Sequence, residues 1–368
     1  DGLRFDAVHS IVDRSPEHIV HELTRHAREI AQPRRLFVVA ENESQDVTLL
    51  NDVVEHGPGG LDAIWNEDWH HAAFVSLTGQ NEAYCTDYDG TANEFAAMAR
   101  WNLLYQGQWY SWQKQRRGTD ARAYPGAAFV CFLENHDQVA NTGRGMRLHQ
   151  LPNQSRWRAM VSLLLLGPNV PMLFQGQECA TPSPFTFFAD HEGELAQAVR
   201  KGRLEFLSQF PSLTDPETRA VLPDPADEVS FRACRISWSG HPGAEEARLL
   251  HTHLLALRQT DPVLSGLGTP GTQVAASAPT PEIVLVRYTG GADERLIVVN
   301  LGRRTKLRMN DPLLAPATQH LRWTMAWCSE RPVYGGPGVA PLDAEGLWTL
   351  QANCAWLFRA EPVRTDGR

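Results

Sequence analysis

The stretch Asn135-His136-Asp137-Gln138 lies just after an apolar run at residues 127–133. Two upstream stretches have the same form: Gly2-Leu3-Arg4-Phe5-Asp6 and Leu36-Phe37-Val38-Val39-Ala40-Glu41. Each is predicted to be a short buried strand that ends near one carboxylate. Carboxylates at the C-terminal ends of strands, with helices between the strands, are how a (β/α)8 barrel builds an active site. A pair of carboxylates facing each other across a sugar cuts glycosidic bonds. These stretches therefore also suggest cleavage of glycosidic bonds.

Strand and helix patterns alternate over residues 1–265, which predicts an α/β fold with a parallel sheet. Five strand-like segments are present, beginning at Leu3, Leu36, Leu61, Ala127 and Val170. A closed TIM barrel needs eight strands. We therefore expect the C-terminal part of a (β/α)8 barrel, strands four to eight, or else an open sheet. The remaining strands are expected upstream of residue 1, which is Asp rather than Met.

Helices are expected where apolar residues recur every three or four positions. The first is expected to be capped by Ser15, with Pro16 at its first position. A long helix is expected at 93–112, and shorter ones at 46–54, 155–166, 194–206 and 245–258. Residues 69–77 fit a helix or a strand, and we favour a helix because the run continues from a strand end. Four aromatic residues recur at helical spacing in the long helix: Trp101, Tyr105, Trp109 and Trp112. Such a stripe can stack on sugars, but on a barrel helix it is more often part of the core.

The pattern changes after Pro262, where short β-rich runs are separated by Gly, Pro and Asp clusters. These runs, at 283–288, 296–301, 305–309, 321–327 and 347–358, predict an all-β sandwich. Residues 266–281 are expected to form a linker. The expected domains are a catalytic barrel portion, 1–265, and a C-terminal β-sandwich, 266–368.

Composition limits the possible classes of protein. The chain has 368 residues, 42% of them hydrophobic, which allows a large core. A net charge of -9 without a Lys/Arg run argues against nucleic-acid binding. No apolar stretch is long enough to cross a membrane. The six cysteines show no CxxC pairing, so we expect reduced thiols and a cytoplasmic location.

The residues alone leave two interpretations for each of the first two carboxylates. Arg4 and Asp6 share one face of a strand, so the arginine can hold the aspartate ionised, or the pair can be a solvated salt bridge. Glu41 follows four apolar residues, and a dry site raises a carboxyl pKa and suits a general acid. Beside Asn42 and Glu43, however, it could simply be an acid at a helix N-terminus.

Two adjacent histidines, His70 and His71, lie close in sequence to Glu67 and Asp68 and could suggest a metal site. Adjacent histidines usually point apart, and the HExxH spacing is absent. We therefore expect no metal and no cofactor, and we favour sugar contact or structural hydrogen bonding for these histidines.

Taken together, the three stretches resemble the motifs of glycoside hydrolase family 13, the alpha-amylase family. The motif residues are 2–9, 39–42 and 135–137. The resemblance implies that Asp6 is the nucleophile, Glu41 the acid/base, and Asp137 the carboxylate that binds substrate hydroxyls and supports the transition state. The family's motif on the third barrel strand is absent. The other residues expected to contact substrate are Arg4, His9, Trp65, Asn66, Asp68, His70, His136, Gln138 and Glu178.

Further stretches, at 65–71, 175–178 and 187–195, resemble the trehalose-releasing members of this family. The implied reaction is retaining hydrolysis of the α-1,4-glucosidic bond next to the terminal trehalose unit of maltooligosyltrehalose. The alternatives are a glycogen debranching or branching enzyme, a non-catalytic α-glucan-binding protein, and an interaction subunit of a transporter. The expected partners are maltooligosyltrehalose or a related α-glucan, and an upstream segment of the same enzyme that closes the barrel.

Overall fold

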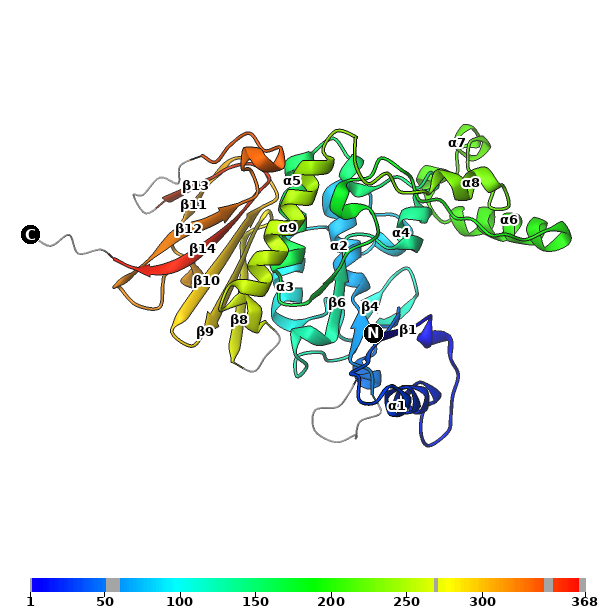
Figure 1. Cartoon of the computed structure of the whole chain (residues 1–368), viewed down its shortest axis with the longest axis horizontal. Helices are drawn as coiled ribbons and strands as arrows, with labels where there is room; N and C mark the ends of the chain where they lie inside the picture. Colours follow the sequence, from blue (N-terminus) through cyan, green and yellow to red (C-terminus); the bar gives the residue numbers. More distant parts are fainter. Residues whose placement is uncertain (1, 51–59, 268–270, 341–346, 364–368) are drawn as a thin grey trace, which may run out of the picture.

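The computed structural model describes residues 2–50, 60–267, 271–340 and 347–363 of the chain. It has three parts along its long axis (Figure 1). An antiparallel β-structure lies at one end, a parallel sheet with its helices lies in the middle, and a segment of short helices lies at the other end.

The parallel sheet has five strands in the order β1-β2-β3-β6-β7. They are β1 (Gly2–Phe5), β2 (Phe37–Ala40), β3 (Ala63–Trp65), β6 (Phe129–Phe132) and β7 (Val170–Met172). All neighbouring pairs are parallel, so the five predicted barrel strands are confirmed. Among the described residues β1 and β7 pair on one side each, which makes them the edges of an open sheet.

Side chains alternate between the two faces of this sheet. One face packs against α1 (Ile19–Ala31) through a cluster of Val38, Ala40, Ile64, Phe129 and Val20. The other face carries a second cluster, made of Val39, Ala63, Trp65, Val130 and Phe132. Arg4 lies on this second face because it pairs directly with Val39 in the parallel register. The predicted site therefore lies on the face that a closed barrel would enclose.

Helices follow the strands as the alternating pattern predicts. α2 (Glu67–Thr78) starts after its cap Asn66 and ends at Gly79, whose φ of 73° favours glycine. α5 (Gln154–Leu166) is buried from Trp157 onward because it lies between the two β-structures. α9 (Ala244–Thr260) packs beside it, and α4 (His136–Asn141) is short. The end segment contains α6 (Gly193–Leu207), α7 (Pro216–Ala220) and α8 (Glu228–Ala233).

The predicted start of the first helix is wrong. The Ser15 amide donates to Asp13 at 2.9 Å and its hydroxyl donates to the Glu17 carbonyl at 2.7 Å, so the hydroxyl is occupied outside the helix. α1 begins at Ile19, whose amide donates to Asp13 at 2.6 Å, and His18 is the N-cap. The helix predicted at 46–54 is a single turn at Val47–Leu49, and residues 51–54 lie outside the described residues.

The long helix predicted at 93–112 is wrong in its second half. α3 (Ala92–Trp101) ends because Asn102 adopts a positive φ of 70° and donates to the carbonyls of Ala121 and Tyr124. The chain then forms a hairpin of β4 (Gln108–Tyr110) and β5 (Gln115–Arg117). The four aromatic residues therefore do not form one helical stripe: Tyr105 and Trp112 pack in the main core, as favoured, whereas Trp101 and Trp109 are 40% and 60% exposed.

The C-terminal part contains a five-stranded antiparallel sheet in the order β12-β14-β10-β9-β8 and a two-stranded sheet of β11 and β13. Its strands are β8 (Thr272–Thr280), β9 (Ile283–Gly290), β10 (Asp293–Asn300), β11 (Thr305–Arg308), β12 (Leu321–Cys328), β13 (Leu347–Leu350) and β14 (Cys354–Pro362). Ile283 and Leu285 face Leu307 and Leu350 of the small sheet. The predicted all-β sandwich is therefore confirmed.

The linker predicted at 266–281 is mostly strand. β8 occupies 272–280 and pairs with β9, and Ala276 and Val274 pack into the main core near α3. Its run of small residues conceals the strand pattern, because alanine and serine carry little β-propensity.

The sandwich packs on the helices of the parallel sheet through buried polar contacts. Arg158 of α5 donates to Glu330 at 2.7 and 3.0 Å, and both side chains are buried. The Tyr288 hydroxyl donates to the Leu166 carbonyl at 2.8 Å. Within the described residues, no helix combines the length and the apolar character needed to cross a membrane.

Candidate active site

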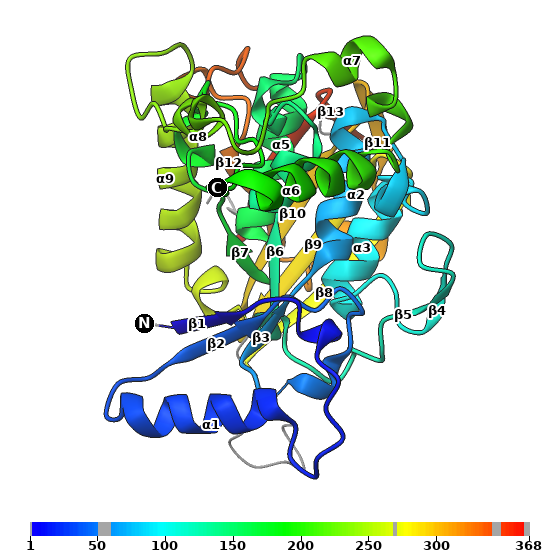
Figure 2. The same ribbon diagram turned by 90° about the vertical axis from the view of Figure 1, so that its right-hand side faces the viewer.

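The three predicted catalytic carboxylates lie beyond the C-terminal ends of their strands. Asp6 follows β1, Glu41 follows β2, and Asp137 is in the first turn of α4, after β6. Since the strands are parallel, these ends meet at one edge of the sheet. Figure 2 shows β1 and β2 side by side, with β3 next to them and α1 along one side.

Arg4 connects the first two carboxylates. Its Nη1 donates to Oδ1 of Asp6 and its Nη2 to Oε2 of Glu41, both at 2.6 Å. The guanidinium lies over the Trp65 ring, 4.4 Å from the centroid, and Trp65 packs against Phe132. The side chain is therefore held between an aromatic platform and two carboxylates, which fixes the relative position of Asp6 and Glu41.

The two carboxylates have opposite pKa shifts. Direct contact with Glu41 lowers the pKa of Asp6, and the charge of Arg4 lowers it further. Burial raises the pKa of Glu41 to about 7, and the contact with Asp6 adds to this, while Arg4 opposes it. At neutral pH Asp6 is ionised and Glu41 keeps much of its proton. This is the division of roles that a nucleophile and a general acid need.

Asp137 and His136, in the first turn of α4, lie close enough to Glu41 and Asp6 to influence their ionisation. Their side chains are about half exposed, and His136 Nε2 lies 3.5 Å from Asp137 Oδ2. The charge of Asp137 raises the pKa of Glu41, and His136 lowers that of Asp6. α4 is held in place by Asn135, whose side chain accepts a hydrogen bond from the Gln138 amide at 2.9 Å.

Three residues predicted to contact substrate are buried and form hydrogen bonds within the protein instead. Asn66 caps α2 and donates to the Asn102 carbonyl at 2.7 Å. Asp68 accepts four hydrogen bonds, from Tyr88, Arg117 and the Leu104 and Tyr105 amides. His70 contacts the Leu133 carbonyl at 2.6 Å, and burial lowers its pKa to about 4. A direct sugar contact does not fit these positions, because their polar atoms already have protein partners.

Two of the remaining predicted contacts, His9 and Glu178, lie at loops beside the strand ends. His9 Nδ1 accepts from the Glu43 amide at 3.3 Å, so it joins the loops after β1 and β2. Glu178 lies in the turn Gln177–Cys179, beyond β7, and its Oε2 is buried without a hydrogen-bond partner in the described structure. Both stay predictions as substrate contacts.

The sequence interpretation missed Glu67, which is 4% exposed and follows β3. Gln138 Nε2 lies 3.3 Å from its Oε2. The signal was present, because an apolar strand followed by a carboxylate is the form of the other three stretches.

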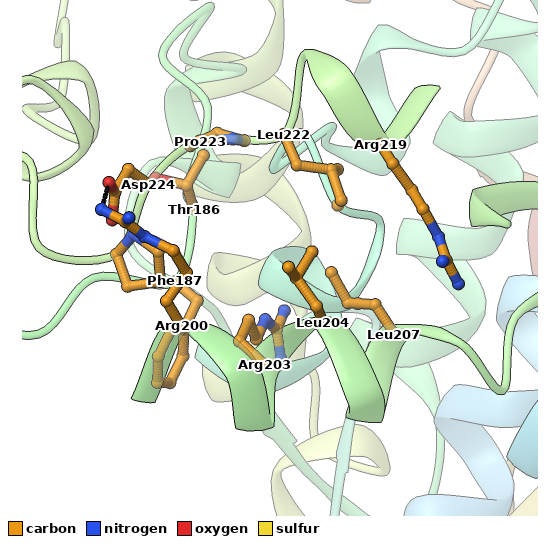
Figure 3. A pocket seen from close by; sticks show the side chains of 12 residues that line it. Thr186, Phe187, Arg200, Arg203, Leu204, Leu207, Arg219, Leu222, Pro223 and Asp224 are labelled. Atoms are coloured by element: carbon orange, nitrogen blue, oxygen red, sulfur yellow. Dashed lines mark hydrogen bonds and ion pairs between the residues drawn. The ribbon is translucent and has the colours of Figure 1, made fainter. Parts of the chain in front are cut away.

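Cavities lie in and beside the end segment. One of about 250 Å³ is lined by three arginines that do not converge (Figure 3). Arg200 pairs with Asp224, Arg203 donates to the Ala140 carbonyl and the Asn141 side chain, and Arg219 lies apart. α6 thereby supports the end of α4. A second cavity, of about 270 Å³, is lined by Gln138 and Asn141 on α4.

The chain was compared with known proteins. No family model matches it. It is 35% identical to the malto-oligosyltrehalose trehalohydrolase of Deinococcus radiodurans over 312 residues, which are 83% of this chain and 49% of that protein. It is 30% identical to the Mycobacterium tuberculosis H37Rv enzyme of that name over 359 residues, 96% of this chain and 58% of that protein.

The comparison with solved structures agrees with the sequence comparison. A candidate alpha-amylase from Salmonella typhimurium superposes with a TM-score of 0.79 at 26% identity, covering 98% of this chain and 57% of that one. A trehalose-6-phosphate hydrolase from Bacillus licheniformis shares the fold, with a TM-score of 0.57 at 15% identity over 98% of this chain and 65% of that one. The chain spans about half the length of the curated relatives it matches. It belongs to the alpha-amylase family of glycoside hydrolases, and within that family it is similar to the malto-oligosyltrehalose trehalohydrolases.

Proposed function

We propose that this chain carries the catalytic carboxylates of a retaining glycoside hydrolase that releases trehalose from maltooligosyltrehalose. The observation that supports this most is the arrangement of Asp6 and Glu41 on one guanidinium, with opposite pKa shifts. Retaining glycosidases hold their two carboxyls about 5–5.5 Å apart, whereas inverting enzymes separate them by roughly 6.5–9.5 Å. A pair in direct contact with one arginine favours the retaining class.

The proposed reaction has two steps. The ionised Asp6 attacks the anomeric carbon of the glucosyl unit, the bond to the trehalose oxygen breaks, and Glu41 gives its proton to that oxygen. The resulting ester joins the glucan to Asp6. Glu41, now ionised, then takes a proton from water, and the water oxygen displaces Asp6 at the same carbon. The starting states of both residues are restored, and the anomeric configuration is retained.

The surrounding residues support these steps. Arg4 stabilises the ionised Asp6 and aims it, while the Trp65 ring keeps the guanidinium in place. Asp137 and His136 are exposed enough to meet the hydroxyls of the reacting sugar. A carboxylate at this position also stabilises the positive charge that develops on the sugar ring in the transition state.

We also propose that an upstream segment of the same enzyme closes the barrel. β1 and β7 pair on one side each in the described structure, so both edges offer free backbone groups. Phe37, at the start of β2, is 42% exposed, on the face that carries Arg4 and Val39. A closed (β/α)8 barrel would cover this face and both edges. A cytoplasmic location is proposed because the six cysteines are free thiols in the described structure.

Product analysis tests the proposed function. The complete enzyme is incubated separately with maltooligosyltrehalose and with glycogen, and products are separated by chromatography. The proposal expects free trehalose from the first substrate and little reaction with the second. The Glu41→Gln variant serves as the matched control for contaminating activity. Linear chains released from glycogen without trehalose from maltooligosyltrehalose would instead support a debranching enzyme, and no turnover of either would support a glucan-binding protein.

A further inference from the structure

A groove in the end segment combines exposed aromatic rings with carboxylates. It has a volume of about 650 Å³ and lies between the loop that precedes α6 and the chain that leads into α8. The rings of Phe188 and Phe231 line it and meet edge to face, with their centroids 5.2 Å apart. Phe231 is 55% exposed. The lining includes the carboxylates of Asp190, Asp227 and Glu228 and, among the described residues, no Lys, Arg or His.

A row of aromatic rings connects this groove to the edge of the sheet where the catalytic carboxylates lie. Phe174 lies two residues beyond β7, and so at the C-terminal edge of the parallel sheet. The ring centroids of Phe174 and Phe185 are 5.0 Å apart, and those of Phe185 and Phe188 are 5.8 Å apart. Phe231 continues the row, and none of the four residues is fully buried. The groove is therefore joined to the proposed active site by unbroken ring contacts.

The walls of the groove are held together by hydrogen bonds. The Ala189 amide donates to the Pro225 carbonyl at 2.8 Å, which joins the loop before α6 to the chain that leads into α8. The Thr186 hydroxyl donates to the Ser230 carbonyl at 3.2 Å, which fixes α8 itself. Because these contacts lie within the protein, the groove has its shape before a ligand binds, which lowers the entropy cost of binding.

The lining favours a neutral ligand that is rich in hydroxyl groups. Ionised carboxylates only accept hydrogen bonds, and aromatic rings offer an apolar face. Without a cation in the lining, an anionic ligand finds no charge partner. Two carboxylates already have partners, since Glu228 pairs with Arg232 at 2.6 Å and Asp227 accepts from the Val229 amide at 2.9 Å. Asp190, which is exposed, remains as an acceptor for hydroxyl groups.

We propose that this groove is an outer binding site for the α-glucan chain of the substrate, where Phe231 stacks on a glucosyl unit and Asp190 accepts its hydroxyls. The inference rests on the proposed function, because the chain that reaches the groove is the one cleaved at Asp6 and Glu41. The units bound there lie beyond the reacting unit. The groove therefore strengthens the binding of long chains and leaves the bond-breaking step unchanged.

The first test compares a short and a long maltooligosyltrehalose in the complete enzyme. Phe231→Ala removes the exposed ring, so KM for the long substrate should rise about 3- to 10-fold, while kcat and KM for the short substrate stay within about 2-fold. Asp190→Ala, in an exposed loop, is a second variant and should act in the same direction. Val229→Ala is the control, because Val229 is 67% exposed on α8, does not line the groove and points to roughly the opposite side of the helix from Phe231.

The second test measures binding of β-cyclodextrin to the complete enzyme by calorimetry. This cyclic α-glucan has no chain end, so it cannot present a trehalose unit to Asp6 and Glu41. Wild type should bind it, and Phe231→Ala should bind it about 3- to 10-fold more weakly.

The outcomes separate this inference from the proposed function. No binding of β-cyclodextrin by wild type, equal binding by wild type, Phe231→Ala and Asp190→Ala, or an equal rise in KM for both substrates would overturn the groove as an outer glucan site. A changed oligomeric state of Phe231→Ala with unchanged glucan binding would assign the groove to a second copy of the chain and overturn it as well. If wild type binds β-cyclodextrin through Phe231 but releases no trehalose, the proposed function fails and the glucan site stands.

Discussion

Arg4 Nη2 lies 2.6 Å from Glu41 Oε2, across the parallel pair β1 and β2. The same guanidinium holds Asp6, so one cation joins the two carboxylates and lowers the pKa of each. An arginine suits this role because its planar fork donates in two fixed directions and stays charged. The pKa of Asp6 falls mainly because of its contact with Glu41, and the pKa of Glu41 rises mainly because it is buried, with 20% of its side chain exposed against 75% for Asp6.

Loss of the acid should abolish turnover without abolishing binding. Glu41→Gln keeps the size of the side chain and a hydrogen bond acceptor for Arg4, but it has no proton to give. The rate on maltooligosyltrehalose should fall by about 10²–10⁴, while calorimetric affinity for the substrate stays within a few-fold. Glu43→Gln is the matched control, since that carboxyl contacts His9 and Gln113 and should cost less than about 10-fold. Near-normal turnover by Glu41→Gln would remove Glu41 from this role.

The pH profile of kcat/KM should follow the pKa shifts of Asp6 and Glu41. Asp6 must be ionised, so the rate rises with pH through its lowered pKa, and Glu41 must be protonated, so the rate falls as pH rises through about 7. The two groups interact, so the limbs report the pair.

Arg4→Met tests the electrostatic part of this account. Removing the cation makes ionisation of both carboxyls harder, so both limbs of kcat/KM should move to higher pH. Arg25→Met, at an exposed pair on α1, should leave the profile unchanged. An alkaline limb that stays in place in Arg4→Met would show that Arg4 does not influence Glu41.

Whether a structural feature could be predicted from the sequence depends on whether its cause lies nearby or far away in the chain. The strands ending in Asp6 and Glu41 were predicted because a local apolar run and the following residue contain the signal. The end of α3 was not predicted, because it depends on Asn102, whose side chain donates to carbonyls about twenty residues away. Likewise β8 depends on its pairing with β9, and its small residues give no pattern of their own.

For a similar reason, the sequence could not separate the predicted substrate contacts that are buried in the fold from those that lie at the strand ends. Composition cannot distinguish a polar residue that faces a sugar from one that holds a turn. Asp68 has the same sequence context as Glu67, yet its oxygens meet two backbone amides, a tyrosine and an arginine, which only the fold brings together. Glu67 meets Gln138 for the same reason.

Breaking the buried ion pair between α5 and the C-terminal β-sandwich should strongly destabilise the protein. Arg158 and Glu330 are both buried, and removing one partner leaves an uncompensated buried charge. Glu330→Ala should lower the free energy of unfolding by about 3–5 kcal/mol, measured by urea denaturation of the complete enzyme. Glu245→Ala, which breaks an exposed pair with Arg248, should change the free energy of unfolding far less, because solvent screens exposed ion pairs. Equal effects of the two variants would contradict the structural account.

The open sheet leads to a prediction about the isolated chain. Residues 1–368 expressed alone should aggregate and show no trehalose release, because none of the described residues pairs with the outer edges of β1 and β7 and Phe37 is 42% exposed. Supplying the upstream segment in trans should restore solubility and activity, measured by light scattering and product analysis. Cooperative unfolding and full activity of this chain by itself would show that the barrel needs no further strands.

The most direct test of the central claim is to identify the residue that becomes glycosylated. A fluorinated α-glucosyl fluoride, whose leaving group needs no acid, is added to the Glu41→Gln variant, and the protein is digested and analysed by mass spectrometry. The account predicts that the glycosyl mass appears on the peptide containing Asp6, because attack still occurs while the water step lacks its base. A label on the peptide containing Asp137, with none on Asp6, would contradict the assignment.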